Sequence, residues 1–335
     1  MEVHYGYPFR GEALEEMRRF LNACGIGYDE GVDFSVCIMD GGRIAAAGSL
    51  DGGVLKCIAV SPDYQGEGLA AQVTTELVNQ AARKGFYHLF IFTKPENLEL
   101  FGSLGFYPIA ETGRALLMEN RKNGIADYVL SLRKGDTDAG PAGCIVANCN
   151  PFTRGHLYLI ESAARRCGLV HLFILSEDKS EFPTEARRLL VQRGTAHLSN
   201  VIVQPAGPYI ISAATFPSYF YKEPSLTAEA NGELDLKIFC ERVARPLGIT
   251  RRFVGTEPFS PLTDSYNALM KKILPGYGIE LIELPRITDN RDGRAVSASR
   301  VRALLREGRL TDVKELVPQV TWEYLTEHYQ DPFNG

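Results

Sequence analysis

The second half of the chain alternates apolar, strand-like runs with amphipathic helical segments, and this alternation restricts the folds available to it. Helical spacing of apolar residues marks the segments 157–167, 185–197, 265–273 and 299–306. Repeated strand–helix units form parallel sheets, and their ligands bind beyond the carboxyl ends of the strands. We therefore predict an α/β domain with a parallel sheet and crossover helices. Its strand-like runs are CIVANC, HLFILS, VIVQPA, RFVGT and IELIEL, which begin at residues 144, 171, 201, 252 and 279.

The first half has a different pattern, in which most strand-like runs precede the helices. An expected helix at 11–23 is followed by FSVCIM, RIAAAGSL and VLKCIAV, and then by an expected helix at 68–84. The strand-like runs YHLFIFT, FYPIA, ALLME and YVLSL follow, with a short helix near 96–103. This order predicts a mixed α+β domain. The polar, glycine-rich stretch RKGDTDAGPAG separates the halves, so we predict domains at 1–135 and 140–335.

Charge and cysteine usage exclude several classes of protein. The formal net charge of −5 does not favour a general surface for nucleic acids or anionic membranes. No apolar stretch approaches the roughly 20 residues that cross a bilayer, and the first residues lack the apolar core of a signal peptide. The seven cysteines are odd in number and never spaced as CxxC, which argues against a disulfide framework or a zinc site. We expect a cytoplasmic protein without nucleic-acid or membrane partners and without a protein-built metal site.

The stretch NPFTRGH lies where the first strand of the second half gives way to a helix. Thr153 can cap that helix or donate its hydroxyl to a phosphate. Gly155 lets a ligand approach the backbone, and His156 lies in the first turn, where free N–H groups favour anions. An N-capped helix with an incidental histidine is the alternative. The flanking candidates for ligand contact are Asn150, Pro151 and Phe152.

A second possible anion site lies near the end of the chain, in AVSASRVRALLREG. Ser297 and Ser299 are capping residues at a helix start, and Arg302 lies one turn further on. Hydroxyl groups and an arginine at a helix N-terminus can hold a phosphate. A basic, solvated helix is the alternative, and the face taken by Arg300 is undecided.

The first half contains a glycine-rich turn, QGEGLA, between an expected strand and an expected helix. Small residues and exposed N–H groups at such a turn can also seat a phosphate. The candidates are Gln65, Gly66, Gly68 and Ala70. An ordinary structural turn is the alternative.

Together, the two motifs of the second half resemble those of the nucleotidyltransferase superfamily, which are (H or T)-x-G-H and I-S-S-T-x-x-(R or K). The second motif departs from that pattern at Val296, Ala298 and Ser299, but its hydroxyls and basic residue remain. The resemblance implies a doubly wound, five-stranded parallel sheet of Rossmann-like type. It also implies attack on the α-phosphate of a nucleotide and release of pyrophosphate, with Mg²⁺ bridging the phosphates. It assigns Thr153, His156 and Arg302 to catalysis, with Ser297 and Ser299 also holding the triphosphate.

The first half, over about residues 30–132, resembles the GNAT acetyltransferase family. Its turn matches the family's pyrophosphate motif, and Asn97 and Tyr107 frame the LGF signature at 104–106. The resemblance implies that the turn binds the pyrophosphate of a coenzyme A-like molecule, with Asn97 and Tyr107 nearby.

The order of the two halves resembles the citrate (pro-3S)-lyase ligase family. That resemblance implies that ATP and acetate form acetyl-AMP and pyrophosphate. The acetyl group then passes to the thiol of a CoA-derived prosthetic group on the acyl carrier subunit of citrate lyase, and AMP leaves. Another nucleotidyltransferase, such as a pantetheine-phosphate adenylyltransferase, and a non-catalytic nucleotide or CoA sensor remain alternatives. Acetate-dependent formation of AMP distinguishes them.

Further candidate ligand contacts follow from positions at the expected ligand edge. Gly255, Thr256 and Glu257 end a strand and are candidates for adenine or ribose contacts, unless they form only a loop. Lys179 and Arg187 are candidates for phosphate contacts, with solvated surface positions as the alternative. The aromatic stretch PYIISAATFPSYF is a candidate acetate pocket or part of the core. The cation that would hold acetate is undecided.

Overall fold

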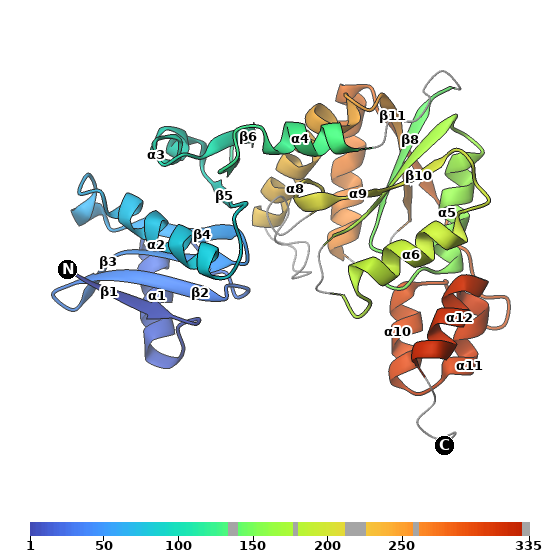
Figure 1. Ribbon diagram of the computed structural model, residues 1–335, viewed down its shortest axis with the longest axis horizontal. Coiled ribbons are helices and arrows are strands. Elements are labelled where there is room, and N and C mark those ends of the chain that lie inside the picture. The colour runs from blue at the N-terminus through green and yellow to red at the C-terminus, as the bar shows by residue number, and fades with distance from the viewer. Residues whose placement is uncertain (133–139, 177–179, 212–225, 257–260, 330–335) are drawn as a thin grey trace. The chain divides into compact units, whose positions relative to one another are not determined.

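The computed structural model describes residues 1–132, 140–176, 180–211, 226–256 and 261–329. Its contacts divide the chain into two compact units, Met1–Gly124 and Ile125–Gly335 (Figure 1). Of the predicted domain limits, 135 lies within residues 133–139, which are outside the described residues, and 140 directly follows them. Helix α4 (Gly124–Ser131) therefore falls almost entirely in the second unit.

The first unit is built on a seven-stranded sheet of order β1-β2-β3-β4-β5-β7-β6. Every neighbouring pair is antiparallel except β4 and β5, which are parallel and pair only through Val54–Phe90 and Leu55–Ile91. Beyond Leu55, therefore, β4 leaves β5. The elements are β1 (Glu2–Gly6), α1 (Gly11–Ala23), β2 (Phe34–Asp40), β3 (Arg43–Asp51), β4 (Val54–Val60), α2 (Leu69–Arg83), β5 (Phe90–Thr93), α3 (Leu98–Ser103), β6 (Tyr107–Glu111) and β7 (Leu116–Glu119).

Helix α2 covers this sheet with the apolar face that its sequence predicts. Leu69, Val73, Leu77 and Ala81 recur at helical spacing and are buried in one cluster with residues of β2, β3 and β4. Gly48 of β3 makes the close approach possible, because a Cβ there would lie 2.6 Å from a methyl carbon of Val73.

One expected strand is wrong. The run YVLSL belongs to helix α4 and the residues that follow it, not to a strand. Ile125, Val129 and Leu132 are buried, and their spacing of four and three residues places them on one helical face. Short apolar runs fit strands and helices equally well, so length alone misled the prediction. Strand β1 was not predicted.

The second unit contains the predicted five-stranded parallel sheet, in the order β10-β9-β8-β11-β12. Helix α8 lies at the end of a region whose sequence has only a weak hydrophobic pattern. The elements are β8 (Ala142–Ala147), α5 (Arg154–Ala164), β9 (Leu169–Ile174), α6 (Thr184–Gly194), β10 (Val201–Pro205), α8 (Leu226–Ile238), β11 (Ile249–Gly255), α9 (Pro261–Ile273), β12 (Glu280–Leu284), α10 (Ala298–Arg306), α11 (Leu310–Val313) and α12 (Gln319–His328).

The strand order reverses between β8 and β11, and this reversal positions the site. From β8 the chain builds outward through α5 and α6 to β10, whereas β11 leads through α9 to β12. Helices α5 and α6 cover one face of the sheet, and α8 and α9 lie on the other (Figure 1). Helices that leave adjacent strands toward opposite faces open a crevice between them.

The C-terminal helices α10, α11 and α12 form a small bundle beside α6 (Figure 1). Its core contains Val301, Val313 and Leu325, together with Phe182 from the loop before α6. None of the helices that the structure describes is both long and apolar enough to span a membrane.

Candidate functional site

A cavity of about 260 Å³ lies at the carboxyl ends of β8 and β11. Its size is near the lower end for small-molecule pockets. The start of α5, the segment before α10 and the first turns of α9 complete its wall. Among the described residues, its lining contains His156, Arg252 and Arg286 but no carboxylate. The cavity therefore favours an anionic ligand.

Thr153 and His156 form a reciprocal cap at the start of α5. The Thr153 N–H donates to Nδ1 of His156 over 3.0 Å, and the His156 N–H donates to Oγ1 of Thr153 over 3.4 Å. Histidine here takes the place that Glu or Gln has in a capping box. Because Nδ1 accepts a hydrogen bond from a backbone N–H, the ring proton of neutral His156 must reside on Nε2.

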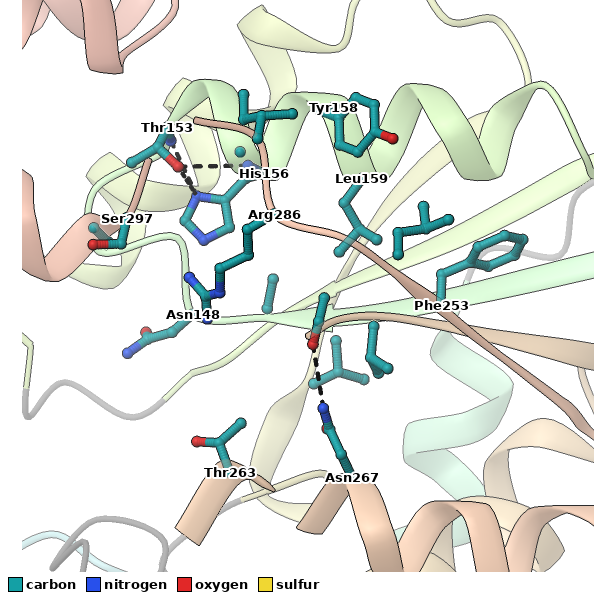
Figure 2. Close-up of a pocket in the computed structure, with 18 of the residues that line it drawn as sticks. Asn148, Thr153, His156, Tyr158, Leu159, Phe253, Thr263, Asn267, Arg286 and Ser297 are labelled. Atoms are coloured by element: carbon teal, nitrogen blue, oxygen red, sulfur yellow. Dashed lines mark hydrogen bonds between the residues drawn. The ribbon is translucent and has the colours of Figure 1, made fainter. Parts of the chain in front are cut away.

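The surroundings of His156 keep its ring neutral. Burial and, to a lesser extent, the positive charge of Arg286 together lower the pKa of His156 to about 4. The ring has some exposure to the cavity that it lines but is surrounded by protein. Arg286 extends into the space between His156 and Asn148 (Figure 2), and its Nε donates to the carbonyl of Thr256 over 2.7 Å. An imidazole N–H and a guanidinium thus share one side of the cavity.

The two predicted anion sites adjoin each other. A Cβ at Gly155 would lie 3.1 Å from the carbonyl oxygen of Val296, so α5 begins directly against the segment that leads into α10. Ser297 caps α10 by accepting the N–H of Arg300 over 3.2 Å, and it lines the same cavity as Thr153 and His156 (Figure 2). The sequence therefore identified two helix starts, 140 or so residues apart, that the fold brings together.

Arg302 ties the two helix starts to each other. Its guanidinium donates to the carbonyl of Asn150 and to Oγ of Ser299, the latter over 3.2 Å, and pairs with Glu181 at 3.3 Å. Burial lowers the pKa of Arg302 from its usual value. Neither Ser299 nor Arg302 lines the cavity. Arg302 instead holds the loop before α5 through the carbonyl of Asn150, and Ser299 accepts a hydrogen bond from the same guanidinium.

Arg187 requires a correction, because it is neither solvated nor directed at the cavity. The residue is fully buried. Its Nε and Nη1 donate to the carbonyls of Phe182, Asn148 and Leu175 over 2.8–3.0 Å. A guanidinium engaged in this way joins three segments of backbone. Arg187 therefore does not contact a ligand in this cavity.

The residues around the loop before α5 are likewise structural. Phe152 is fully buried in the core between the sheet and α5, and Oδ1 of Asn150 accepts the N–H of Phe182 over 3.1 Å. Pro151 is also buried. The side chains of all three shape the loop and do not line the cavity.

Several of the remaining predicted contact residues lie outside the described residues, and the cavity has further lining residues that the sequence did not predict. Gly255 lines the cavity, and the N–H of Thr256 donates to the carbonyl of Leu284. Lys179, Glu257 and most of the aromatic stretch lie outside the described residues. Several polar lining residues were not predicted, namely Asn148, Arg252, Thr263, Tyr266, Asn267 and Arg286. Three of them follow strand ends at the predicted ligand edge.

The first unit has a cavity of its own, of about 530 Å³, where β4 and β5 separate. Gly66 and Gly68 have φ of 87° and 77°, which glycine adopts without strain. Gly68 is the N-cap of α2. Asn97 donates from Nδ2 to Oγ1 of Thr93 over 2.8 Å. Tyr107 does not line this cavity, whereas the other predicted residues do, namely Gln65, Gly66, Gly68, Ala70 and Asn97.

Among the described residues, no three His, Cys, Asp or Glu side chains gather where they could share a metal ion. The cavity at β8 and β11 offers cationic groups and neutral oxygens. A divalent ion would fit there only in company with an anionic ligand that supplies its oxygens.

Comparisons with known proteins cover both units. The citrate lyase ligase C-terminal domain family matches residues 142–325, and the acetyltransferase (GNAT) family matches residues 9–106. The chain is 42% identical to the citrate (pro-3S)-lyase ligase of Klebsiella pneumoniae over 323 residues, 95% of this chain and 93% of that one. It is 42% identical to the ligase of that name from Escherichia coli strain K12 over 318 residues, 93% and 90% of the two chains.

Among solved structures, Thermotoga maritima TmcAL bound with alpha-thio ATP aligns with a TM-score of 0.34 and 16% identity, over 56% of each chain. The fold and the family matches define a two-domain ligase, in which a GNAT domain is followed in the sequence by an α/β domain with a five-stranded parallel sheet. The chain belongs to the citrate lyase ligase family and is an enzyme. The predictions of fold class and family are thereby confirmed.

Proposed function

We propose that this protein uses ATP and acetate to acetylate the prosthetic-group thiol on the acyl carrier subunit of citrate lyase. Acetyl-AMP is the intermediate in this proposal. The relatives named above support the acceptor, because they are named as ligases of citrate lyase. The seven cysteines are free thiols, which supports a reducing compartment such as the cytoplasm.

One observation carries the adenylating half of the proposal. The starts of α5 and α10 meet on one cavity that contains an imidazole N–H and two guanidinium groups but no described carboxylate. Helix N-termini and cations are the groups that bind polyphosphates. A triphosphate across both helix starts would place its α-phosphate in reach of an acid in the same crevice.

In the first step, a carboxylate oxygen of acetate attacks the α-phosphorus, and the bond to the β,γ-pyrophosphate breaks. The charge that develops on the transferring phosphoryl group needs donors already in place. The Nε2–H of His156 and the guanidinium of Arg286 are placed to provide them. Any Mg²⁺ would arrive with the triphosphate and neutralise its oxygens.

In the second step, the thiol of the carrier attacks the acetyl carbonyl of acetyl-AMP. The thioester forms, the thiol proton passes to solvent and AMP leaves. We propose that the glycine turn Gln65–Ala70 holds the pyrophosphate of the prosthetic group during this step. The separation of β4 from β5 and the exposed N–H groups at the start of α2 support that role.

The adenylating half can be tested without the carrier. The protein is incubated with ATP, Mg²⁺ and ¹³C-labelled acetate, and the products are examined by mass spectrometry and for pyrophosphate. Labelled acetyl-AMP and acetate-dependent pyrophosphate are expected. Pyrophosphate formed only with a pantetheine phosphate as acceptor would instead identify an adenylyltransferase, and no turnover with any acid would favour a sensor.

A further inference from the structure

Arg252 is a buried cation that the proposed reaction has not yet used. It lies on β11, is only 2% exposed, and lines the cavity at the strand reversal. Its neighbour Arg251 has a different environment, since it is partly exposed and its Nε pairs with Glu280 at 3.0 Å. Strand alternation therefore directs one arginine outward and the other into the protein.

Among the described residues, few polar contacts offset the free-energy cost of burying the charged guanidinium of Arg252. Nε is buried and has no hydrogen-bond partner among the described residues. Nη1 lies 3.8 Å from Sγ of Cys144, and the guanidinium carbon lies 4.5 Å from the ring centre of Phe239. A sulfur contact and a ring face are weak partners for a buried charge, which ordinarily requires a carboxylate or another anion.

The neighbouring groups that titrate do not supply that anion. Burial raises the pKa of the Cys144 thiol to about 11 and that of the Cys240 thiol to about 12, so both are neutral near pH 7. The buried carboxylate of Asp235 accepts the Tyr266 hydroxyl over 2.6 Å and the Ile211 N–H over 2.8 Å. No described carboxylate forms an ion pair with Arg252 within 4.0 Å.

The position of Arg252 separates it from the phosphate-binding end. Arg252 pairs in register with Cys144 of β8, and Phe253 points to the opposite face, into the core beneath α5. Arg252 therefore faces α8 and α9, whereas Thr153 and His156 lie at the start of α5. At about 3.3 Å per residue, its Cα is roughly 10 Å inside the strand end at Gly255.

The cavity wall on the Arg252 side suits a short acyl chain. Val146 and Val254 follow Cys144 and Arg252 by two residues on their strands and so share their face. Both line the cavity, as do Ile211 and Met270. A cation among branched and flexible apolar side chains matches a small carboxylic acid, with its carboxylate on the guanidinium and its methyl group against the wall.

We propose that Arg252 binds the carboxylate of the acid substrate and is a determinant of acid recognition. This assignment rests on the proposed function, because it identifies the residue that holds the acid for attack on the nucleotide. A guanidinium contributes charge-assisted hydrogen bonds to the carboxylate. The acid in turn supplies the anion that the buried Arg252 lacks.

The test compares Arg252→Met with wild type in acetate-dependent ATP–pyrophosphate exchange. We expect the KM for acetate to rise by about 10- to 100-fold, as the loss of a charged hydrogen bond predicts. The Kd for a non-hydrolysable ATP analogue, measured by calorimetry, should change by less than about threefold. Cys144→Ser is the matched control: it changes the sulfur that faces Nη1 and keeps the guanidinium, so the KM for acetate should stay near that of wild type.

An unchanged acetate KM in folded Arg252→Met would overturn the assignment, as would a loss of ATP affinity at constant acetate KM. If Arg252→Met does not fold, Arg252→Lys provides the same test, because it keeps the charge but loses the planar fork. A wild-type enzyme that exchanges pyrophosphate without acetate would overturn the proposed function itself. Exchange that needs acetate but ignores Arg252 would overturn only the assignment made here.

Discussion

The backbone N–H of Thr153 donates to Nδ1 of His156 over 3.0 Å, and this single contact defines which ring nitrogen carries the proton. Thr153 caps the helix start, and His156 completes this reciprocal cap by accepting the Thr153 N–H at Nδ1. The other nitrogen, Nε2, keeps its hydrogen and remains a donor. Local helix stability and the orientation of a reactive group thus depend on the same residue.

Removal of the imidazole should therefore reduce turnover more than nucleotide binding. For His156→Ala we expect kcat of acetate-dependent exchange to fall by about 10²- to 10³-fold, the cost of losing one donor that stabilises transition-state charge. The Kd for an ATP analogue should rise only a few-fold. His197→Ala is the control, since His197 is exposed and, among the described residues, forms an ion pair with Glu161 alone, at the surface. A weaker affinity for the ATP analogue with an unchanged kcat would mean that His156 merely binds the ground state.

The low pKa of His156 makes stability depend on pH in a defined direction. Its folded pKa is about 4 and its ordinary value is 6.5, so the unfolded chain binds this proton more readily. The stabilisation is fully present above pH 6.5 and is lost as the pH falls toward 4. At pH 5 the loss from this residue is at most about 2 kcal/mol.

Urea unfolding of wild type and His156→Gln at pH 8 and pH 5 measures this contribution. The free energy of unfolding should fall more steeply for wild type than for the variant. His171 is also neutral in the fold, because burial lowers its pKa to about 4, and it remains in both proteins as an internal reference. Equal losses of the free energy of unfolding in the two proteins would show that the pKa of His156 is not lowered in the folded state.

The buried guanidinium of Arg187 should matter for stability and not for chemistry. Arg187→Met leaves three backbone carbonyls without their donor, and we expect a loss of about 2–5 kcal/mol in the free energy of unfolding. The adjacent Arg188 is exposed and pairs with Glu185 one turn away. Arg188→Met should therefore cost less than about 0.5 kcal/mol. Similar melting temperatures for the two variants would contradict the structural role of Arg187.

The proposed role of the first unit can be tested by placing a charge at the start of α2. Ala70→Glu puts a carboxylate where it favours the helix but repels a pyrophosphate. Transfer of the acetyl group to the carrier should fall at least tenfold, while acetate-dependent pyrophosphate exchange stays within about twofold. Gly68 is unsuitable for this test, because its φ of 77° would strain any side chain.

Asn79→Glu controls for the added charge, because Asn79 is exposed near the other end of α2. It should leave both activities near those of wild type. If Ala70→Glu reduced exchange and transfer together, the division of labour between the two units would be wrong.

Patterns of local sequence predicted most of the fold. The α/β alternation after residue 144 gave all five parallel strands, and the stripe on α2 gave its buried face. The run YVLSL, which begins at Tyr128, was predicted as a strand because its apolar residues fit both the strand and the helix period over so short a length. Strand β1 is only five residues long and mostly exposed, so it carries no hydrophobic signal.

The polar side chains were harder to predict because their roles depend on distant partners. Arg187 and Arg188 are neighbours on one helix, yet one joins buried carbonyls and the other lies in solvent. Nothing local to α6 distinguishes them. Arg251 and Arg252 differ in the same way, since the choice of face follows from the register of β11 against β8. Motif spacing identified the helix starts, but only tertiary structure shows which cations face the crevice.

The contact between Gly155 and Val296 has a consequence for how the protein is made. A growing polypeptide acquires the first half of this pocket long before the second, because synthesis must proceed from β9 through β12 before it reaches α10. During that interval the nascent chain contains His156 but lacks the Val296–Ala298 side of the cavity. The complete pocket thus forms only after α10 has been synthesised and packs beside α5.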